Sequence, residues 1–183
     1  NLDSAYILMD DEKGGFLATE YLLKLGHKDI AGIFLSDDLQ GVKRQAGFLS
    51  ALRKYHVSVN NEFLGNYSTE QMFSYPYQFT KNLLQKKKKP TAIFCYNDQI
   101  AIQVIEAIRH SSLKIPGDIS LVGYDNSNLA VATEIKLTTI NHPKEEMGKR
   151  VASMIVDMIN GKESKPRFVY QPELVIRSSS REL

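Results

Sequence analysis

The chain has 183 residues, of which 43% are hydrophobic and 24% are charged, close to the averages of soluble globular proteins. Its 23 basic and 21 acidic residues give a formal net charge of +2, without the concentrated basic excess of a surface that binds nucleic acid by charge. The single cysteine excludes an intramolecular disulfide framework and CxxC motifs. No apolar run reaches the roughly 18 residues of a membrane span. The chain begins Asn-Leu-Asp-Ser without an initiator methionine, so we expect it to be a piece of a longer protein.

Short apolar runs alternate along the chain with segments of helical periodicity. In chain order, the sequence predicts a strand at 5–9, a helix from 10 to 25, a strand at 30–35, a helix ending near 55, a weak strand at 62–65 and a helix over 70–85. The second half predicts a strand at 91–96, a helix that begins after 97, a strand at 119–124, a short strand at 137–140, a helix from Pro143 to 160 and short strands at 168–170 and 174–176.

This alternation predicts an α/β fold with a largely parallel sheet. The unbroken apolar runs TAIFCY at 91–96 and ISLVGY at 119–124 are typical of central strands covered on both faces. The only charge run, Lys86–Lys89, is interpreted as a solvated helix end; DNA contact is the lesser alternative.

Polar side chains follow several of the predicted strands, where ligands bind in open parallel sheets. Arg44 follows the strand at 30–35, in the first turns of the next helix, while Asn97, Asp125 and His142 come just after later strands. Such groups hydrogen-bond the hydroxyls of a sugar, and Tyr67 offers an aromatic face for a sugar ring. Because Arg44 and Asp125 lie at element ends, we expect their substitution to spare the fold.

Each of these residues also has a purely structural interpretation. Asn97 is a helix N-cap candidate, Asp125 a turn former, Arg44 a partner for a carboxylate and His142 a cap or surface residue. Cys95 lies inside an apolar run and is interpreted as a packed hydrophobic residue. The sequence has no GxSxG, HExxH, GxGxxG or P-loop motif, and its four histidines are dispersed. We therefore expect no enzyme, no cofactor and no metal site.

Several segments together resemble the effector-binding module of LacI/GalR repressors: GGFLATEYLLKLGHKDIAGIF (14–34), GVKRQAGFLSAL (41–52), PTAIFCYNDQIAI (90–102), IPGDISLVGYDNS (115–127), LTTINHPKEEMGKRVASMI (137–155) and PELVIRSSS (172–180). The resemblance covers nearly the whole chain. Segments 32–44, 94–98 and 135–144 are most similar to arabinose-responsive repressors, which join a GntR-type winged helix to this sensor.

The resemblance implies a periplasmic-binding-protein-like fold of type I, with two Rossmann-like lobes and an N-lobe that is incomplete in this chain. It implies that residues 1–27 and 141–161 are parts of the N-lobe and that residues 28–140 and 162–183 form the C-lobe. The earlier N-lobe strands and an N-terminal DNA-binding domain are expected outside this sequence.

The resemblance also implies ligand-binding roles, carried over by motif. Arg44, Asn97 and Asp125 match effector-contacting positions, His142 falls where several members place a polar contact, and Tyr67 matches an aromatic that stacks on the ligand; Lys43 and Gln40 rank lower. The implied protein is a cytoplasmic, homodimeric repressor that binds a pentose, with L-arabinose favoured, and then releases operator DNA, without membrane contact. The alternatives are a periplasmic-type sugar-binding protein of a transporter and, third, a sugar-processing enzyme.

Overall fold

The computed structural model describes residues 5–162 and 167–183. Its main feature is a six-stranded sheet whose spatial order is β3 (Leu64–Tyr67), β2 (Ile30–Leu35), β4 (Ala92–Cys95), β5 (Ser120–Asp125), β6 (Thr138–Asn141) and β8 (Glu173–Val175). The first five strands are parallel, and β8 pairs antiparallel with β6. The predicted α/β class is confirmed, and the carboxyl ends of the five parallel strands meet at one edge of the sheet.

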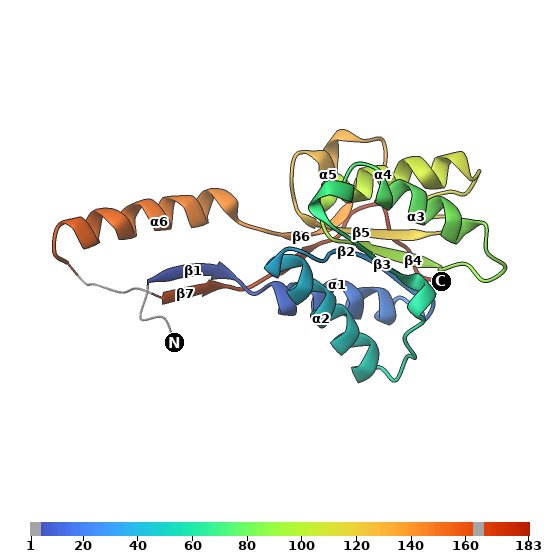
Figure 1. Cartoon of the computed structure of the whole chain (residues 1–183), viewed down its shortest axis with the longest axis horizontal. Helices are drawn as coiled ribbons and strands as arrows, with labels where there is room; N and C mark the ends of the chain where they lie inside the picture. The colour runs from blue at the N-terminus through green and yellow to red at the C-terminus, as the bar shows by residue number, and fades with distance from the viewer. Residues whose placement is uncertain (1–4, 163–166) are drawn as a thin grey trace.

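Helices cover both faces of this sheet (Figure 1). One face carries α1 (Asp11–Lys24) and α2 (Leu39–Lys54), and the other carries α3 (Tyr75–Leu84), α4 (Asp98–His110) and the short α5 (Leu129–Ala132). On the side of α1 and α2, Phe34 of β2 packs edge to face against Phe94 of β4 and against Phe48 of α2. Side chains of β2, β4 and β5 alternate between the two cores, as the apolar runs predicted.

Two predicted elements differ from the structure by more than one residue at an end. The weak strand predicted at 62–65 is β3 at Leu64–Tyr67, because a 3-10 turn at Asn61–Phe63, capped by the Asn60 side chain, precedes it. The helix predicted over 70–85 is divided into a 3-10 turn, Thr69–Gln71, and α3, which begins at Tyr75. Pro76 lies in the first turn of α3, where a missing N–H costs little.

A second, smaller part extends from the large sheet (Figure 1). Strand β1 (Tyr6–Met9) pairs in parallel with β7 (Arg167–Tyr170), and α6 (Lys144–Ile159) lies beside them. The apolar stripe predicted on α6 is present in sequence, yet no residue of this helix is buried. None of the helices in the described ranges is long and apolar enough to cross a membrane.

Helix α1 precedes the expected division at residue 27. Helix α1 packs against α2 and the large sheet, with Ala18 and Leu22 fully buried in the same core as Phe34. Within 162–183, β7 pairs with β1 whereas β8 belongs to the large sheet. The described residues thus place α1 with the larger part and β7 with the smaller one. The assignment of these parts to the two lobes of a complete module stays a prediction.

Candidate functional site

Arg44 lies at the centre of the polar groups gathered at the carboxyl edge of the large sheet. Its side chain is only 1% exposed, so Arg44 is buried, contrary to the position that the expected tolerance of its substitution assumed. Nε donates to Asp11 Oδ1 at 2.8 Å, and Nη1 donates to the backbone carbonyl of Tyr96 at 2.8 Å. The guanidinium also lies over the ring of Tyr124, 3.6 Å from its centroid. Burial opposes the charge, but the carboxylates of Asp11 and Asp125 outweigh it and hold the pKa of Arg44 above its ordinary value.

The third nitrogen of the Arg44 guanidinium, Nη2, differs from the other two. Nη2 is buried and has no hydrogen-bond partner among the described residues, and it lies 3.8 Å from Asp125 Oδ1. A buried donor without an acceptor is costly in a protein interior. A ligand oxygen beside this pair, within hydrogen-bond distance of both Nη2 and the Asp125 carboxylate, would satisfy this donor.

Asp125, the last residue of β5, faces Arg44 from the neighbouring part of the rim. Its φ is +104°, and that of Asn126 is +48°, backbone conformations that non-glycine residues adopt rarely and that gather at functional sites. The Asn126 side chain secures the turn, because its Oδ1 accepts from Arg177 Nη2 at 2.6 Å and its Nδ2 donates to Asn141 Oδ1 at 3.1 Å. Asp125 thus ends β5 in a left-handed backbone conformation, and its carboxylate faces the guanidinium.

The residues after β6 also reach Asp125. Nδ1 of His142 lies 3.4 Å from Asp125 Oδ1, and Lys144 Nζ donates to Asp125 Oδ2 at 3.0 Å. Burial raises the pKa of Asp125, but the hydrogen bond from His142 and the charges of Arg44 and Lys144 outweigh burial and hold it below the ordinary value. Asp125 therefore remains an acceptor of hydrogen bonds at neutral pH.

Asn97 is the N-cap of α4, since its Oδ1 accepts from the Ile100 backbone N–H at 3.0 Å. This structural interpretation, which the sequence left open, is confirmed. The cap uses only Oδ1, so the amide group of Asn97 is the part that would donate to a ligand.

The structure gives less direct evidence for the other three predicted ligand-binding residues. Tyr67 is 1% exposed and already stacks on Tyr75, with ring centroids 6.2 Å apart, while Tyr96 meets it edge to face. Gln40 and Lys43 are partly exposed in the first two turns of α2. The roles of all three residues stay predictions.

Four residues of this network were not predicted from the sequence: Asp11, Tyr96, Tyr124 and Asp98. Asp98 is buried and accepts from Ser127 N–H at 2.7 Å and from the Thr139 hydroxyl at 2.7 Å, which ties α4 to the turn after β5. Tyr96 and Tyr124 follow the rule that residues at strand ends face the ligand edge, a signal that the sequence does contain. Asp11 looked like an ordinary acidic helix start, and its sequence position carries no signal of its link to Arg44.

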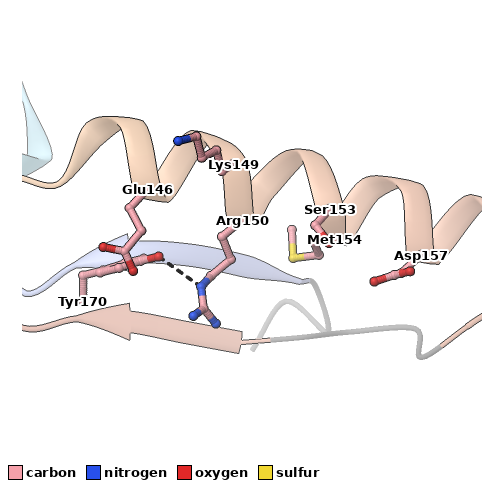
Figure 2. A pocket seen from close by; sticks show the side chains of 7 residues that line it. All are labelled: Glu146, Lys149, Arg150, Ser153, Met154, Asp157 and Tyr170. Atoms are coloured by element: carbon pink, nitrogen blue, oxygen red, sulfur yellow. Dashed lines mark hydrogen bonds between the residues drawn. The ribbon is translucent and has the colours of Figure 1, made fainter.

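Two cavities lie near the junction of the two parts. One, of about 560 Å3, is lined by Asp125, Asn126, His142 and the first turns of α6, and it is linked to Arg44 through Asp125, because Arg44 is not among its lining residues. The other, of about 490 Å3, lies between α6 and β7 and is lined by Arg150 and Tyr170, whose hydroxyl accepts from Arg150 Nε at 3.0 Å (Figure 2). None of the predicted ligand-binding residues lines the second cavity. The first is therefore the candidate ligand cavity.

Comparison with known proteins identifies a family for this chain. Residues 19–180 match the periplasmic binding protein-like domain. The chain belongs to this family. A LacI family transcriptional regulator from Enterococcus faecium, solved with bound ribose, is 31% identical and superposes with a TM-score of 0.87, covering 100% of this chain and 68% of that one. A CelR–cellobiose complex is 29% identical with a TM-score of 0.88, covering 97% of this chain and 54% of the other. The resemblance to the LacI/GalR effector-binding module is confirmed.

Curated relatives carry regulatory names. The arabinose metabolism transcriptional repressor of Geobacillus stearothermophilus is 46% identical over 97% of this chain, and that of Halalkalibacterium halodurans is 41% identical over 99%. The chain spans about half the length of these two proteins, 50% in each case. This periplasmic binding protein-like module therefore corresponds to part of a longer regulator in those relatives.

Proposed function

We propose that this chain is the effector-sensing part of a sugar-responsive transcriptional repressor, and that its effector is a pentose, with L-arabinose the first candidate. The observation that carries the proposal is the buried, unpartnered Nη2 of Arg44, 3.8 Å from Asp125 Oδ1. A sugar hydroxyl fits this pair of groups, because its oxygen accepts from Nη2 while its proton goes to the carboxylate. The names of the arabinose repressors and the ribose-bound regulator support a pentose.

The charges around Arg44 favour a neutral ligand. The cations Arg44 and Lys144 are accompanied by the carboxylates of Asp11, Asp125, Asp98 and Asp38, the last of which accepts from the Tyr96 hydroxyl at 2.6 Å. An anionic ligand would meet this acidic surplus, whereas hydroxyl groups carry no charge. A free sugar therefore suits the site better than its phosphate ester.

The mechanism follows from where the contacts to Asp125 originate. His142 and Lys144 lie on the segment that leads from β6 into α6, so they connect the large sheet to the smaller part. A sugar that bonds to Asp125 competes with these contacts and shifts the populations of the arrangements of the two parts. In the proposed whole protein, a homodimer in the cytoplasm, this shift changes the spacing of DNA-binding domains that precede the chain and releases operator DNA. The role requires no catalytic step and no cofactor.

A periplasmic-type sugar-binding protein, the alternative that the sequence left open, has the same fold. The curated relatives that match 97% and 99% of the chain are named as repressors, which favours the regulatory role.

The proposal is tested by calorimetry of the intact protein with L-arabinose. Asp125→Asn removes the charge but keeps a residue that tolerates positive φ, and it should weaken binding roughly 10- to 100-fold, the cost of losing a hydrogen bond to a charged group. In a gel shift, the variant should remain on operator DNA at sugar concentrations that release the wild type. Lys87→Ala, in the exposed lysine run, is the control and should alter neither result. Equal arabinose affinity in Asp125→Asn and the wild type would remove Asp125 from the site.

A further inference from the structure

Asp11 is a carboxylate in the protein interior, where charged side chains are uncommon. Its side chain is 6% exposed, and its Oδ1 lies 2.8 Å from Nε of Arg44. It belongs to α1, whereas Arg44 belongs to α2, so the ion pair joins two helices that pack together over the large sheet. A buried ion pair contributes little net stability compared with apolar packing. The main effect of this pair is on the orientation of the Arg44 guanidinium.

Two glycines fix the distance between these helices. A Cβ on Gly15 would lie 2.1 Å from the backbone oxygen of Arg44, and a Cβ on Gly47 would lie 1.9 Å from that of Glu12. The backbones of α1 and α2 are therefore in direct contact at this crossing. Asp11 is one turn before Gly15 on the same face of α1, and Arg44 is one turn before Gly47 on α2. The crossing thus places the carboxylate beside the guanidinium.

The guanidinium is consequently held on every side but one. Asp11 takes Nε, the Tyr96 carbonyl takes Nη1 and the Tyr124 ring covers the flat face, while Nη2 remains without a partner. Without Asp11, the guanidinium is free to turn toward Asp125, the next carboxylate, and to occupy the acceptor that the ligand would use. The hydrogen bond to Asp11 therefore restricts how the guanidinium can turn.

We propose that Asp11 is the positioning residue of the effector site: it fixes Arg44 so that a single N–H faces Asp125, and it acts on the ligand only through Arg44. This inference rests on the proposed function for the identity of the ligand, but the orientation of Arg44 is tested without any ligand.

The first measurement is a ¹H–¹⁵N spectrum of the ligand-free chain. The Nε–H signal of Arg44, assigned by its loss in Arg44→Lys, should exchange slowly with solvent because it is buried and bonded to a carboxylate. Asp11→Asn should shift this signal and speed its exchange. Asp10→Asn makes the same change one residue earlier, at the N-cap of α1 whose Oδ1 accepts from Lys13 N–H, and it should leave the signal unchanged. An unchanged Arg44 signal in Asp11→Asn would overturn the proposal.

The second measurement is a double-mutant cycle on L-arabinose affinity in the intact protein. Asp11→Asn should weaken binding roughly tenfold in the wild-type background and clearly less in Arg44→Lys, because the lysine ammonium lacks the forked N–H groups that Asp11 orients. Asp10→Asn should have no effect in either background. An equal loss from Asp11→Asn in both backgrounds would show that Asp11 acts through stability alone and would overturn the proposal.

A further variant keeps the test decisive if Asp11→Asn does not fold. Asp11→Glu keeps the charge and moves the carboxylate by one methylene, so the same cycle applies: a loss that depends on Arg44 supports positioning, and an equal loss in both backgrounds overturns it. Wild-type protein that does not bind L-arabinose would contradict the proposed effector, and the ligand-free spectra would then decide the role of Asp11 on their own.

Discussion

Helices α4 and α6 show how differently the two parts of this chain are held together. Helix α4 has 13 residues, seven of them buried against the large sheet, whereas α6 has 16 residues and none is buried. Both have the apolar periodicity of an amphipathic helix, yet Ile159 of α6 is 78% exposed. A pattern in the sequence therefore tells which face of a helix is apolar, but a partner must be present before that face contributes stability.

The same difference separates the two sheets. The six-stranded sheet has helices on both faces, and its central strands are fully buried. The pair β1 and β7 leaves Leu8, Phe168 and Val169 between 37% and 45% exposed, and two strands alone bury too little to be stable. The candidate ligand cavity lies where these two parts join. We infer that the large sheet supplies a rigid wall of the site and that the junction supplies its adaptability.

The largest expected effect compares two arginines, one in each part. Arg44→Ala should destabilise the chain by about 3–5 kcal/mol, because it leaves the Asp11 carboxylate buried without its partner. Arg150→Ala removes an exposed guanidinium that stacks on Phe168, 3.9 Å from the ring centroid, and bonds to the Tyr170 hydroxyl. That change should cost less than about 1 kcal/mol. Urea unfolding of both variants measures the contrast, and equal losses would contradict it.

A second contrast uses one substitution in both parts. Ile33→Ala, in β2 where the side chain is 0% exposed, should cost about 2–5 kcal/mol through lost burial and the cavity left behind. Ile159→Ala, at the end of α6, should stay within about 0.5 kcal/mol. The loss of urea midpoint in each variant, relative to the wild type, measures how much that isoleucine contributes to stability. A large loss in Ile159→Ala would show that α6 is covered in solution.

The contrast also explains what the sequence could predict. Strands such as IAGIFL at 30–35 and ISLVGY at 119–124 are recognisable because burial on both faces demands an unbroken apolar run. Arg44 and Asp125 were predicted to meet because parallel strand ends share one edge, and the structure places them 3.8 Å apart. The ion pair of Arg44 with Asp11 was not predicted, because it depends on the crossing of α1 and α2 at Gly15 and Gly47. Such a contact depends on tertiary geometry and leaves no local pattern.

The smallest expected effect concerns pH and the opposite edge of the large sheet. His27 is 2% exposed; its Nδ1 lies 2.9 Å from the Thr91 hydroxyl and its Nε2 lies 3.0 Å from the Ser120 hydroxyl. Burial lowers the pKa of His27 below its ordinary value near 6.5. The unfolded chain therefore binds this proton more readily than the folded chain, so the stability present above pH 6.5 should be lost progressively as the pH falls below 6.5.

The measurement for His27 is the urea midpoint at pH 8 and at pH 5.5, compared between the wild type and His27→Gln. Glutamine can hydrogen-bond to the same hydroxyl groups but does not titrate, so the variant should lose less stability than the wild type between these two pH values. His56→Gln is the control, because His56 is exposed in the turn after α2 and its substitution should leave the pH dependence of the wild type intact.

The carboxylates also contribute: Asp125, whose pKa is held low in the folded chain, favours folding above its unfolded pKa and loses that contribution only at more acidic pH. The difference between His27→Gln and the wild type over this interval reports on His27, whereas the total loss also includes other groups, such as Asp98, whose pKa burial raises. If His27→Gln and the wild type lost equal stability across it, the buried imidazole of the larger part would have no role in its acid sensitivity.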